Sequence, residues 1–209
     1  TATDKTITVL EDGRHTFTAA DFGFSDSQDN PANTLVAIII TTLPGSGALT
    51  LNGVAVTQDQ VIAVADIGQM LFTPAANANG NSYASIGFKV QDNGGTDNSG
   101  ADTSESANTL TFNVTSVNDA PTLDSSLSRT LVTASQNDAA PAPGQTLGST
   151  LVSDLLQGTE DIDASPLQGM AITSVNANGT LHYSLDAGAT WLLADNLSVS
   201  HALLLPLHA

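Results

Sequence analysis

Residues 109–123, TLTFNVTSVNDAPTL, begin as a β-strand and end as a joint. In the first half of the stretch apolar and polar side chains alternate, which is typical of a strand with one buried face. The second half carries Asn118 and Asp119 and then Pro121, a residue that cannot donate a backbone hydrogen bond and that interrupts a sheet. A strand that ends in an amide, a carboxylate and a proline predicts a boundary between two modules.

Upstream of this joint, residues 1–108 contain further short apolar runs separated by turn residues. Residues 35–42 are rich in β-branched side chains and indicate a strand buried on both faces. Asn52–Gly53 lies between two such runs and is the dipeptide most typical of a two-residue hairpin. Residues 58–69 have room for one short helical turn, but no window shows the period of an amphipathic helix. The pattern predicts an all-β antiparallel β-sandwich, with other strands at residues 5–10, 15–18, 48–51, 54–56, 61–64, 70–73, 86–90 and 110–114.

Beyond the joint the composition changes twice. Residues 122–150 are dominated by Ser, Thr, Ala, Pro and Gly, which predicts a linker or an irregular first strand of the next module. Strand patterns return from Leu151, and Asn178–Gly179 indicates another hairpin. We expect a first module over 1–121, the linker or irregular strand over 122–150, and a second, incomplete β module over 151–209. About four strands are expected there, too few for a sandwich of its own.

The charge of the chain is strongly unbalanced. Its 209 residues include 21 acidic and 4 basic side chains, for a formal net charge of −17. Nucleic acid and anionic membranes are therefore unfavourable partners, because binding to phosphate needs Lys and Arg. There is no cysteine for a disulfide or a thiolate metal site, and no apolar stretch long enough to span a bilayer. Such a chain favours cations as partners.

Carboxylates recur where the apolar runs end. A hard cation such as Ca²⁺ needs six to eight oxygen ligands, which several strand ends and a linker can supply together. Asp and Asn are also common in turns that hold no metal, so a solvated turn is the alternative at each position. Glu11 and Asp119 are the strongest candidates, and the full set is Glu11, Asp12, Asp26, Asp29, Asp92, Asn118, Asp119, Asp161 and Asp163.

Two motifs resemble the cadherins. VQDNGG (90–95), followed by LTFNVTSVNDAP (110–121), is similar to the cadherin pattern in which A-x-D-x-G precedes V-x-V-x-D-x-N-D-N-x-P. More closely, residues 1–122 resemble the cadherin-like tandem repeats of large RTX-type bacterial surface adhesins. EDIDASPLQGMAIT (160–173) and LHYSLDAGATW (181–191) resemble a second module of such proteins. The first resemblance also runs through VLEDG, FTAADFGFSD, ITTLP, LTLNGVAVT and FTPAANANG.

The resemblance implies an Ig-like, cadherin-like sandwich with calcium between modules. Matched by position, the calcium ligands would be Glu11, Asp92 and Asn118–Asp119, with Asp26 and Asp29 as a D-x-D-like pair.

This chain departs from the cadherin pattern at the linker. Ser116 stands where cadherins have the first linker Asp, Ala120 follows Asp119 directly, and Asp26 and Asp29 are three residues apart. We therefore expect fewer or more weakly bound ions, with Asp92 at the opposite end from Asp119 and incompletely coordinated.

Three function classes remain open from the sequence. The first is a structural extender module of a secreted or cell-surface bacterial protein, stiffened by calcium, with neighbouring repeats or other copies of the chain as partners. The alternative is a subunit of an extracellular filament whose incomplete module is completed by a neighbour's strand. A sugar-binding domain is disfavoured because Trp191 is the only tryptophan. No nucleophile–base or zinc-type histidine spacing supports an enzyme or a small-molecule substrate.

Overall fold

The structure is a computed structural model and describes residues 1–133, 135, 138–146, 148–176 and 179–207. The chain divides into two compact units, Thr1–Asn118 (unit 1) and Asp119–Ala209 (unit 2). Strands supply most of the regular structure in the described residues of both, so the predicted all-β class is confirmed. The hairpin expected at Asn178–Gly179 lies outside the described residues, because Asn178 is not among them.

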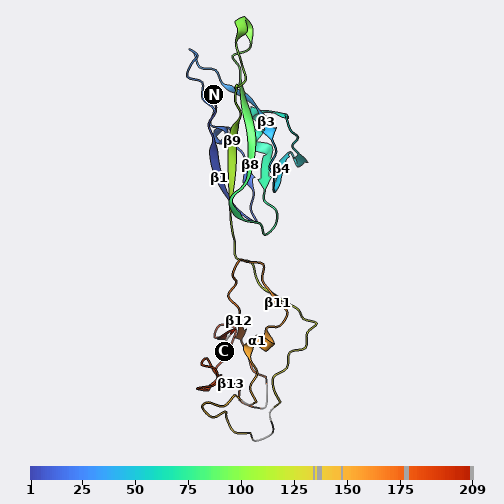
Figure 1. Cartoon of the computed structure of the whole chain (residues 1–209), viewed down its shortest axis with the longest axis vertical. Coiled ribbons are helices and arrows are strands. Elements are labelled where there is room, and N and C mark those ends of the chain that lie inside the picture. The colour runs from blue at the N-terminus through green and yellow to red at the C-terminus, as the bar shows by residue number, and fades with distance from the viewer. Residues whose placement is uncertain (134, 136–137, 147, 177–178, 208–209) are drawn as a thin grey trace. The chain divides into compact units, whose positions relative to one another are not determined.

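Unit 1 contains two sheets (Figure 1). The larger has the order β1-β9-β8-β3-β6, formed by Lys5–Leu10, Asn108–Thr115, Gly80–Asp92, Leu35–Thr42 and Val61–Ala63. The smaller has the order β2-β7-β4-β5, formed by His15–Thr16, Met70–Thr73, Ala48–Leu51 and Val54–Ala55. Three short 3₁₀ helices complete the unit: η1 (Ala19–Phe22), η2 (Val64–Gln69) and η3 (Asp97–Ser99).

Side chains from both sheets of unit 1 share one hydrophobic core. Leu110, Phe112 and Val114 of β9 are buried, as their alternation with polar residues predicts. Phe112 stacks on Phe72 of β7, with ring centroids 3.8 Å apart, so the two sheets meet through aromatic packing. The Ig-like or cadherin-like identity of this arrangement stays a prediction.

The first strand pairs differently from the sequence-based expectation. β1 lies parallel to β9, with Lys5 opposite Leu110 and Leu10 opposite Thr115, whereas the other strands of that sheet are antiparallel. Parallel neighbours need a long connection, and here almost the whole of unit 1 lies between the two strands. This pairing places Glu11, the residue after β1, beside the end of β9.

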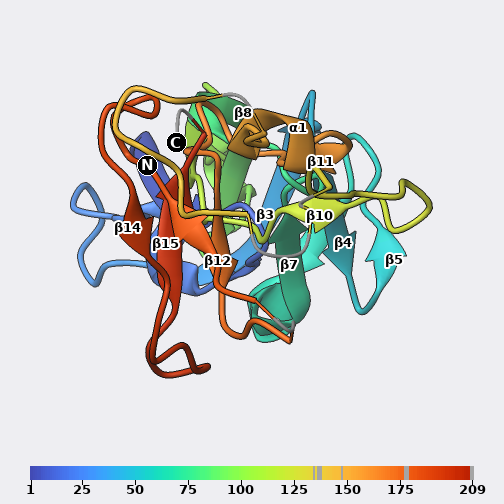
Figure 2. The ribbon, with the colours of Figure 1, turned by 90° about the horizontal axis from the view of Figure 1, so that it is seen from below.

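The described residues of unit 2 form three separate two-stranded sheets and one short helix. Figure 2 shows β12 beside β15, which pair from Gly169–Pro206 to Ile172–Leu203. The described residues of unit 2 therefore form no larger single sheet. The elements are β10 (Thr122–Leu123) with β11 (Thr159–Glu160), β12 (Gly169–Ile172) with β15 (Leu203–Pro206), β13 (His182–Tyr183) with β14 (Leu192–Leu193), and α1 (Val152–Leu155).

Part of the Ala- and Pro-rich segment folds back onto the β13–β14 hairpin. The Gly144 amide donates to the Gly188 carbonyl at 2.8 Å, and the Trp191 indole donates to the Gln145 carbonyl at 3.0 Å. Residues 144–145 are thus tied to the β13–β14 hairpin by hydrogen bonds, although both remain exposed. Within the described part of the chain, no helix has the length and apolar character needed to cross a membrane.

Candidate metal centre

Glu11 is a buried carboxylate at the end of β1, with only 3% of its surface exposed. The strand pairing continues through it, because its amide donates to the Thr115 carbonyl at 3.0 Å. Its Oε2 accepts a hydrogen bond from Asn79 Nδ2 at 2.8 Å, and its Oε1 accepts one from the Val117 amide at 2.6 Å. The Asn79 bond, followed by the Val117 bond, lowers the pKa of Glu11. Glu11 is therefore held as an anion against the segment that leaves β9.

Asp163 binds the backbone of Asp119, the first residue of unit 2. Its Oδ2 accepts a hydrogen bond from the Asp119 amide at 2.9 Å. Its own amide donates to Asp161 Oδ1 at 3.0 Å, which folds the turn after β11. The pairing of Thr122 with Glu160 brings these two parts of the chain together. The sequence could not show this contact, because 44 residues separate Asp119 from Asp163.

Glu11, Asp119 and Asp163 form a group of acids that could hold a metal ion. Glu11 binds the amide of Val117 within unit 1, and Asp163 binds the amide of Asp119 within unit 2. Each carboxylate has about four lone-pair sites and can accept an N–H while also binding a cation.

Three other predicted ligands gather elsewhere in unit 1. Asp26 Oδ2 accepts the Asn33 amide at 2.7 Å, and Asp29 Oδ2 accepts Asn33 Nδ2 at 2.9 Å. Asp92 Oδ1 accepts the Gly94 amide at 2.9 Å and closes a turn beside Asn33. Asp92 ends the 13-residue strand β8, whose first residue follows Asn79. At about 3.3 Å per residue, this strand separates the Asp92 turn from Glu11 by roughly 40 Å.

The remaining predicted ligands, Asp12, Asn118 and Asp161, lie within two residues of Glu11, Asp119 and Asp163 in the sequence. Asp12 lies exposed in the turn after Glu11, which the Gly13 amide closes onto the Leu10 carbonyl at 2.9 Å. Asn118 is exposed in the segment between Val117 and Asp119. Asp161 orients the backbone of Asp163. The structure thus assigns Asp161 a positioning contact within this part of unit 2.

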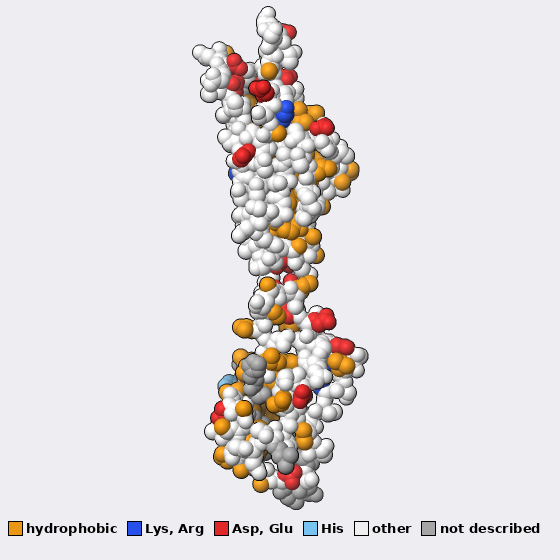
Figure 3. Space-filling view, in the orientation of Figure 1, with side chains coloured by type: hydrophobic (Ala, Val, Ile, Leu, Met, Phe, Trp, Pro, Cys, Tyr) orange, Lys and Arg blue, Asp and Glu red, His pale blue; other side chains and the backbone are white. Residues whose placement is uncertain are grey.

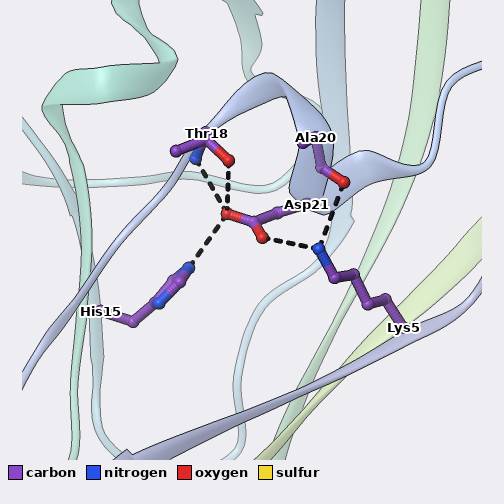
Figure 4. Close-up of polar contacts among 5 residues, drawn as sticks. All are labelled: Lys5, His15, Thr18, Ala20 and Asp21. Atoms are coloured by element: carbon purple, nitrogen blue, oxygen red, sulfur yellow. Dashed lines mark hydrogen bonds and ion pairs between the residues drawn. The ribbon is translucent and has the colours of Figure 1, made fainter.

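A second polar cluster surrounds Asp21, which the sequence did not single out (Figure 4). Its Oδ1 lies 2.9 Å from Lys5 Nζ, and its Oδ2 lies 3.1 Å from His15 Nε2. Oδ2 also accepts the Thr18 amide at 2.9 Å and the Thr18 hydroxyl at 3.1 Å. Burial raises the pKa of Asp21, but the hydrogen bonds from Lys5, Thr18 and His15 outweigh it and lower the pKa. The cluster fastens η1 to β1 and β2.

A third carboxylate organises the turn between β13 and β14. Asp186 accepts hydrogen bonds from the Thr190 amide at 2.8 Å, the Thr190 hydroxyl at 2.6 Å and the Ser184 hydroxyl at 2.8 Å. The bonds from the Thr190 hydroxyl and amide, then that from Ser184, lower the pKa of Asp186. These hydrogen bonds of Asp186 lie within its own turn. Asp186 is not a member of the group formed by Glu11, Asp119 and Asp163.

Comparison with known proteins found no match: no family model, no curated protein and no solved structure is similar to this chain. The resemblance to cadherin-like repeats therefore remains a prediction from the residues.

Proposed function

We propose that the chain is a structural segment of a secreted or cell-surface bacterial protein, in which calcium binds the carboxylates of Glu11, Asp119 and Asp163. The observation that carries the proposal is the pair of carboxylates, Glu11 and Asp163, on the amides of Val117 and Asp119. The net charge of −17 supports a cation as the ligand. Calcium suits the site because it binds oxygen ligands in flexible geometry, and water or backbone carbonyls can add to the three acids.

Calcium at this position would act on the connection between β9 and β10. A cation bound by Glu11, Asp119 and Asp163 fixes the segment 117–119 and offsets the repulsion of three carboxylates. Extracellular calcium modules bind with dissociation constants of about 10⁻⁴–10⁻³ M. The segment would then be stiff outside the cell, where calcium is abundant, and more mobile after chelation.

Calcium titration with matched variants tests this function. A site with a dissociation constant of about 10⁻⁴ M stabilises the folded chain by about 1.4 kcal/mol at about 1 mM calcium. We expect the melting temperature to rise by several degrees when calcium replaces chelator, and the rise to shrink in Asp119→Asn and Asp163→Asn. Asp59→Asn is the control, because this substitution removes the same charge from another loop. Asp59 has a φ of 60°, a backbone conformation that Asn also adopts.

Two results would count against calcium binding at this site. One is a melting curve that does not change when calcium is added after chelation. The other is an equal loss of the calcium effect in Asp59→Asn and Asp163→Asn. That result would mean that the rise in melting temperature depends on net charge alone.

A second candidate function, a self-assembling subunit, is favoured by the surface of unit 2. Leu167, Val199 and Leu204 are 102%, 91% and 71% exposed, and Figure 3 shows hydrophobic side chains at many points of this unit's surface. In the described residues β12 and β15 pair only with each other, so each has one open edge. Strand donation from another copy would cover both features and would not close on itself.

Static light scattering separates the two candidates. An extender module should keep the mass of a monomer at all concentrations with calcium present. A subunit that completes itself with a neighbour's strand should gain mass as the concentration rises, and Leu204→Ser in β15 should reduce that gain.

A further inference from the structure

Asn79 is a neutral partner of Glu11, one of the two buried acids of unit 1. It lies in the loop between β7 and β8, its residue is exposed, and its Nδ2 donates to Glu11 Oε2 at 2.8 Å. The next residue is Gly80, the first of β8, with a φ of 148°. No heavy atom lies within 4 Å of the position that a Cβ on Gly80 would occupy. The loop therefore presents an exposed asparagine before a half-buried glycine, with the side-chain amide of Asn79 against the carboxylate of Glu11.

Asn–Gly is the dipeptide in which asparagine loses its side-chain amide most readily. The backbone nitrogen of the glycine attacks Cγ of the asparagine, the Cγ–Nδ2 bond breaks, and ammonia leaves. Water then opens the five-membered imide, and the product is aspartate or isoaspartate. A side chain on the following residue would hinder ring closure, and glycine has none. This reaction is one reason that asparagine is a thermally labile residue.

We propose that Asn79–Gly80 is a site of spontaneous deamidation, and that the product places a second carboxylate against Glu11. The hydrogen bond from Nδ2 to Oε2 is lost, and two like charges meet where a donor and an acceptor met before. Without a cation, the loop between β7 and β8 is pushed away from the end of β1. Unit 1 is destabilised at the residue that holds Val117.

Deamidation would also change the response to calcium, a consequence that rests on the proposed function. The new carboxylate adds an anionic oxygen ligand next to Glu11 and offers calcium a stronger site. Ageing would thus convert a weakly calcium-dependent chain into a strongly calcium-dependent one. The chain would be stable in calcium-rich fluid and would loosen where calcium is scarce.

Asn52–Gly53 provides a matched control within unit 1. It is also exposed, and the space around a Cβ on Gly53 is equally open. It forms the tip of the hairpin between β4 and β5, and the backbone N–H of Asn52 donates to the Gln69 carbonyl at 3.2 Å. Conversion there adds the same charge without placing it against Glu11.

Peptide mass mapping of the aged full-length chain tests the chemistry. The purified chain is incubated with chelator at mildly alkaline pH, digested, and mapped at both dipeptides. We expect the Asn79 peptide to gain the mass of an amide-to-acid conversion. An unchanged Asn79 peptide at a time when the Asn52 peptide has converted would overturn the proposal.

Melting curves test the consequence. In chelator, we expect Asn79→Asp to melt several degrees below both the unaltered chain and Asn79→Ala, which loses the donor without gaining a charge. Asn52→Asp should melt like the unaltered chain. If Asn79→Asp and Asn79→Ala melt alike in chelator, the like-charge contact is wrong.

Calcium addition then separates the two proposals. We expect calcium to raise the melting temperature of Asn79→Asp more than that of the unaltered chain. If calcium raises neither, the proposed calcium function is wrong. The deamidation site is still decided by the mass map and the chelator curves, which involve no calcium.

Discussion

At the scale of single residues, the structure treats its buried acids in one consistent way. Asp21 is 7% exposed and Glu11 is 3% exposed, and each carboxylate receives hydrogen bonds on both of its oxygens. Donors on both sides hold an acid ionised in spite of burial. The two acids differ in what surrounds them: Asp21 faces Lys5 and His15, whereas Glu11 faces neutral amides. This leaves Glu11 with the stronger attraction for a metal ion.

The lowered pKa of Asp21 predicts a specific dependence of stability on pH. A carboxyl with a lower pKa in the folded than in the unfolded chain stabilises the fold above its unfolded pKa, about 3.9. That contribution is lost as the pH falls through the folded value. Asp21→Asn should therefore be less stable than the unaltered chain at neutral pH, and the difference should shrink below about pH 4. Denaturant unfolding of both proteins in chelator measures it.

The difference in unfolding free energy between the unaltered chain and Asp21→Asn isolates the contribution of Asp21 from that of the other acids. Glu11 and Asp186 titrate equally in both proteins, so their contributions cancel in the difference. Lys5 and His15 face Asp21 and remain in both. A stability difference that stayed constant from neutral pH to about pH 3 would mean that folding does not lower the pKa of Asp21.

At the scale of elements, alternation in the sequence predicted most strands of unit 1. β9 buries Leu110, Phe112 and Val114 as expected, and η2 falls within the segment where one helical turn was expected. β3 was expected to be buried on both faces, but Val36 is 41% exposed, and the pairing of β3 with β8 shifts register between Leu35 and Ala37. A composition rich in β-branched residues cannot show such a bulge.

Strand partners could not be predicted in the same way. The parallel pairing of β1 with β9 joins residues about a hundred positions apart, and no local pattern encodes it. The acid group depends on that pairing, because it brings Glu11 to the Val117 amide. Glu11 and Asp119 were predicted as ligands from the charge of the chain, from their place at strand ends and from the resemblance to cadherin-like repeats. Their neighbours Asn79 and Asp163 meet them only through contacts between distant segments.

At the scale of the whole molecule, the two units differ in how much core they contain. The buried cluster of unit 1 draws on both of its sheets and includes five phenylalanines: Phe17, Phe22, Phe72, Phe88 and Phe112. Among the described residues of unit 2, only Val152 and Leu205 are buried apolar side chains. Small sheets of two strands are marginal in water without such cover. Unit 1 therefore carries most of the hydrophobic stabilisation of the chain.

This difference predicts that heat unfolds the chain in two steps. Unit 2 should lose its structure first, because few apolar groups hold it, and unit 1 should follow at a higher temperature. Calorimetry of the full chain in chelator should show two transitions, and a fragment of residues 1–120 should retain only the upper one. The fragment keeps every residue of the unit 1 core and both partners of the Glu11–Val117 bond. A single transition in the full chain, or a fragment that fails to fold, would show that unit 1 depends on unit 2 for its stability.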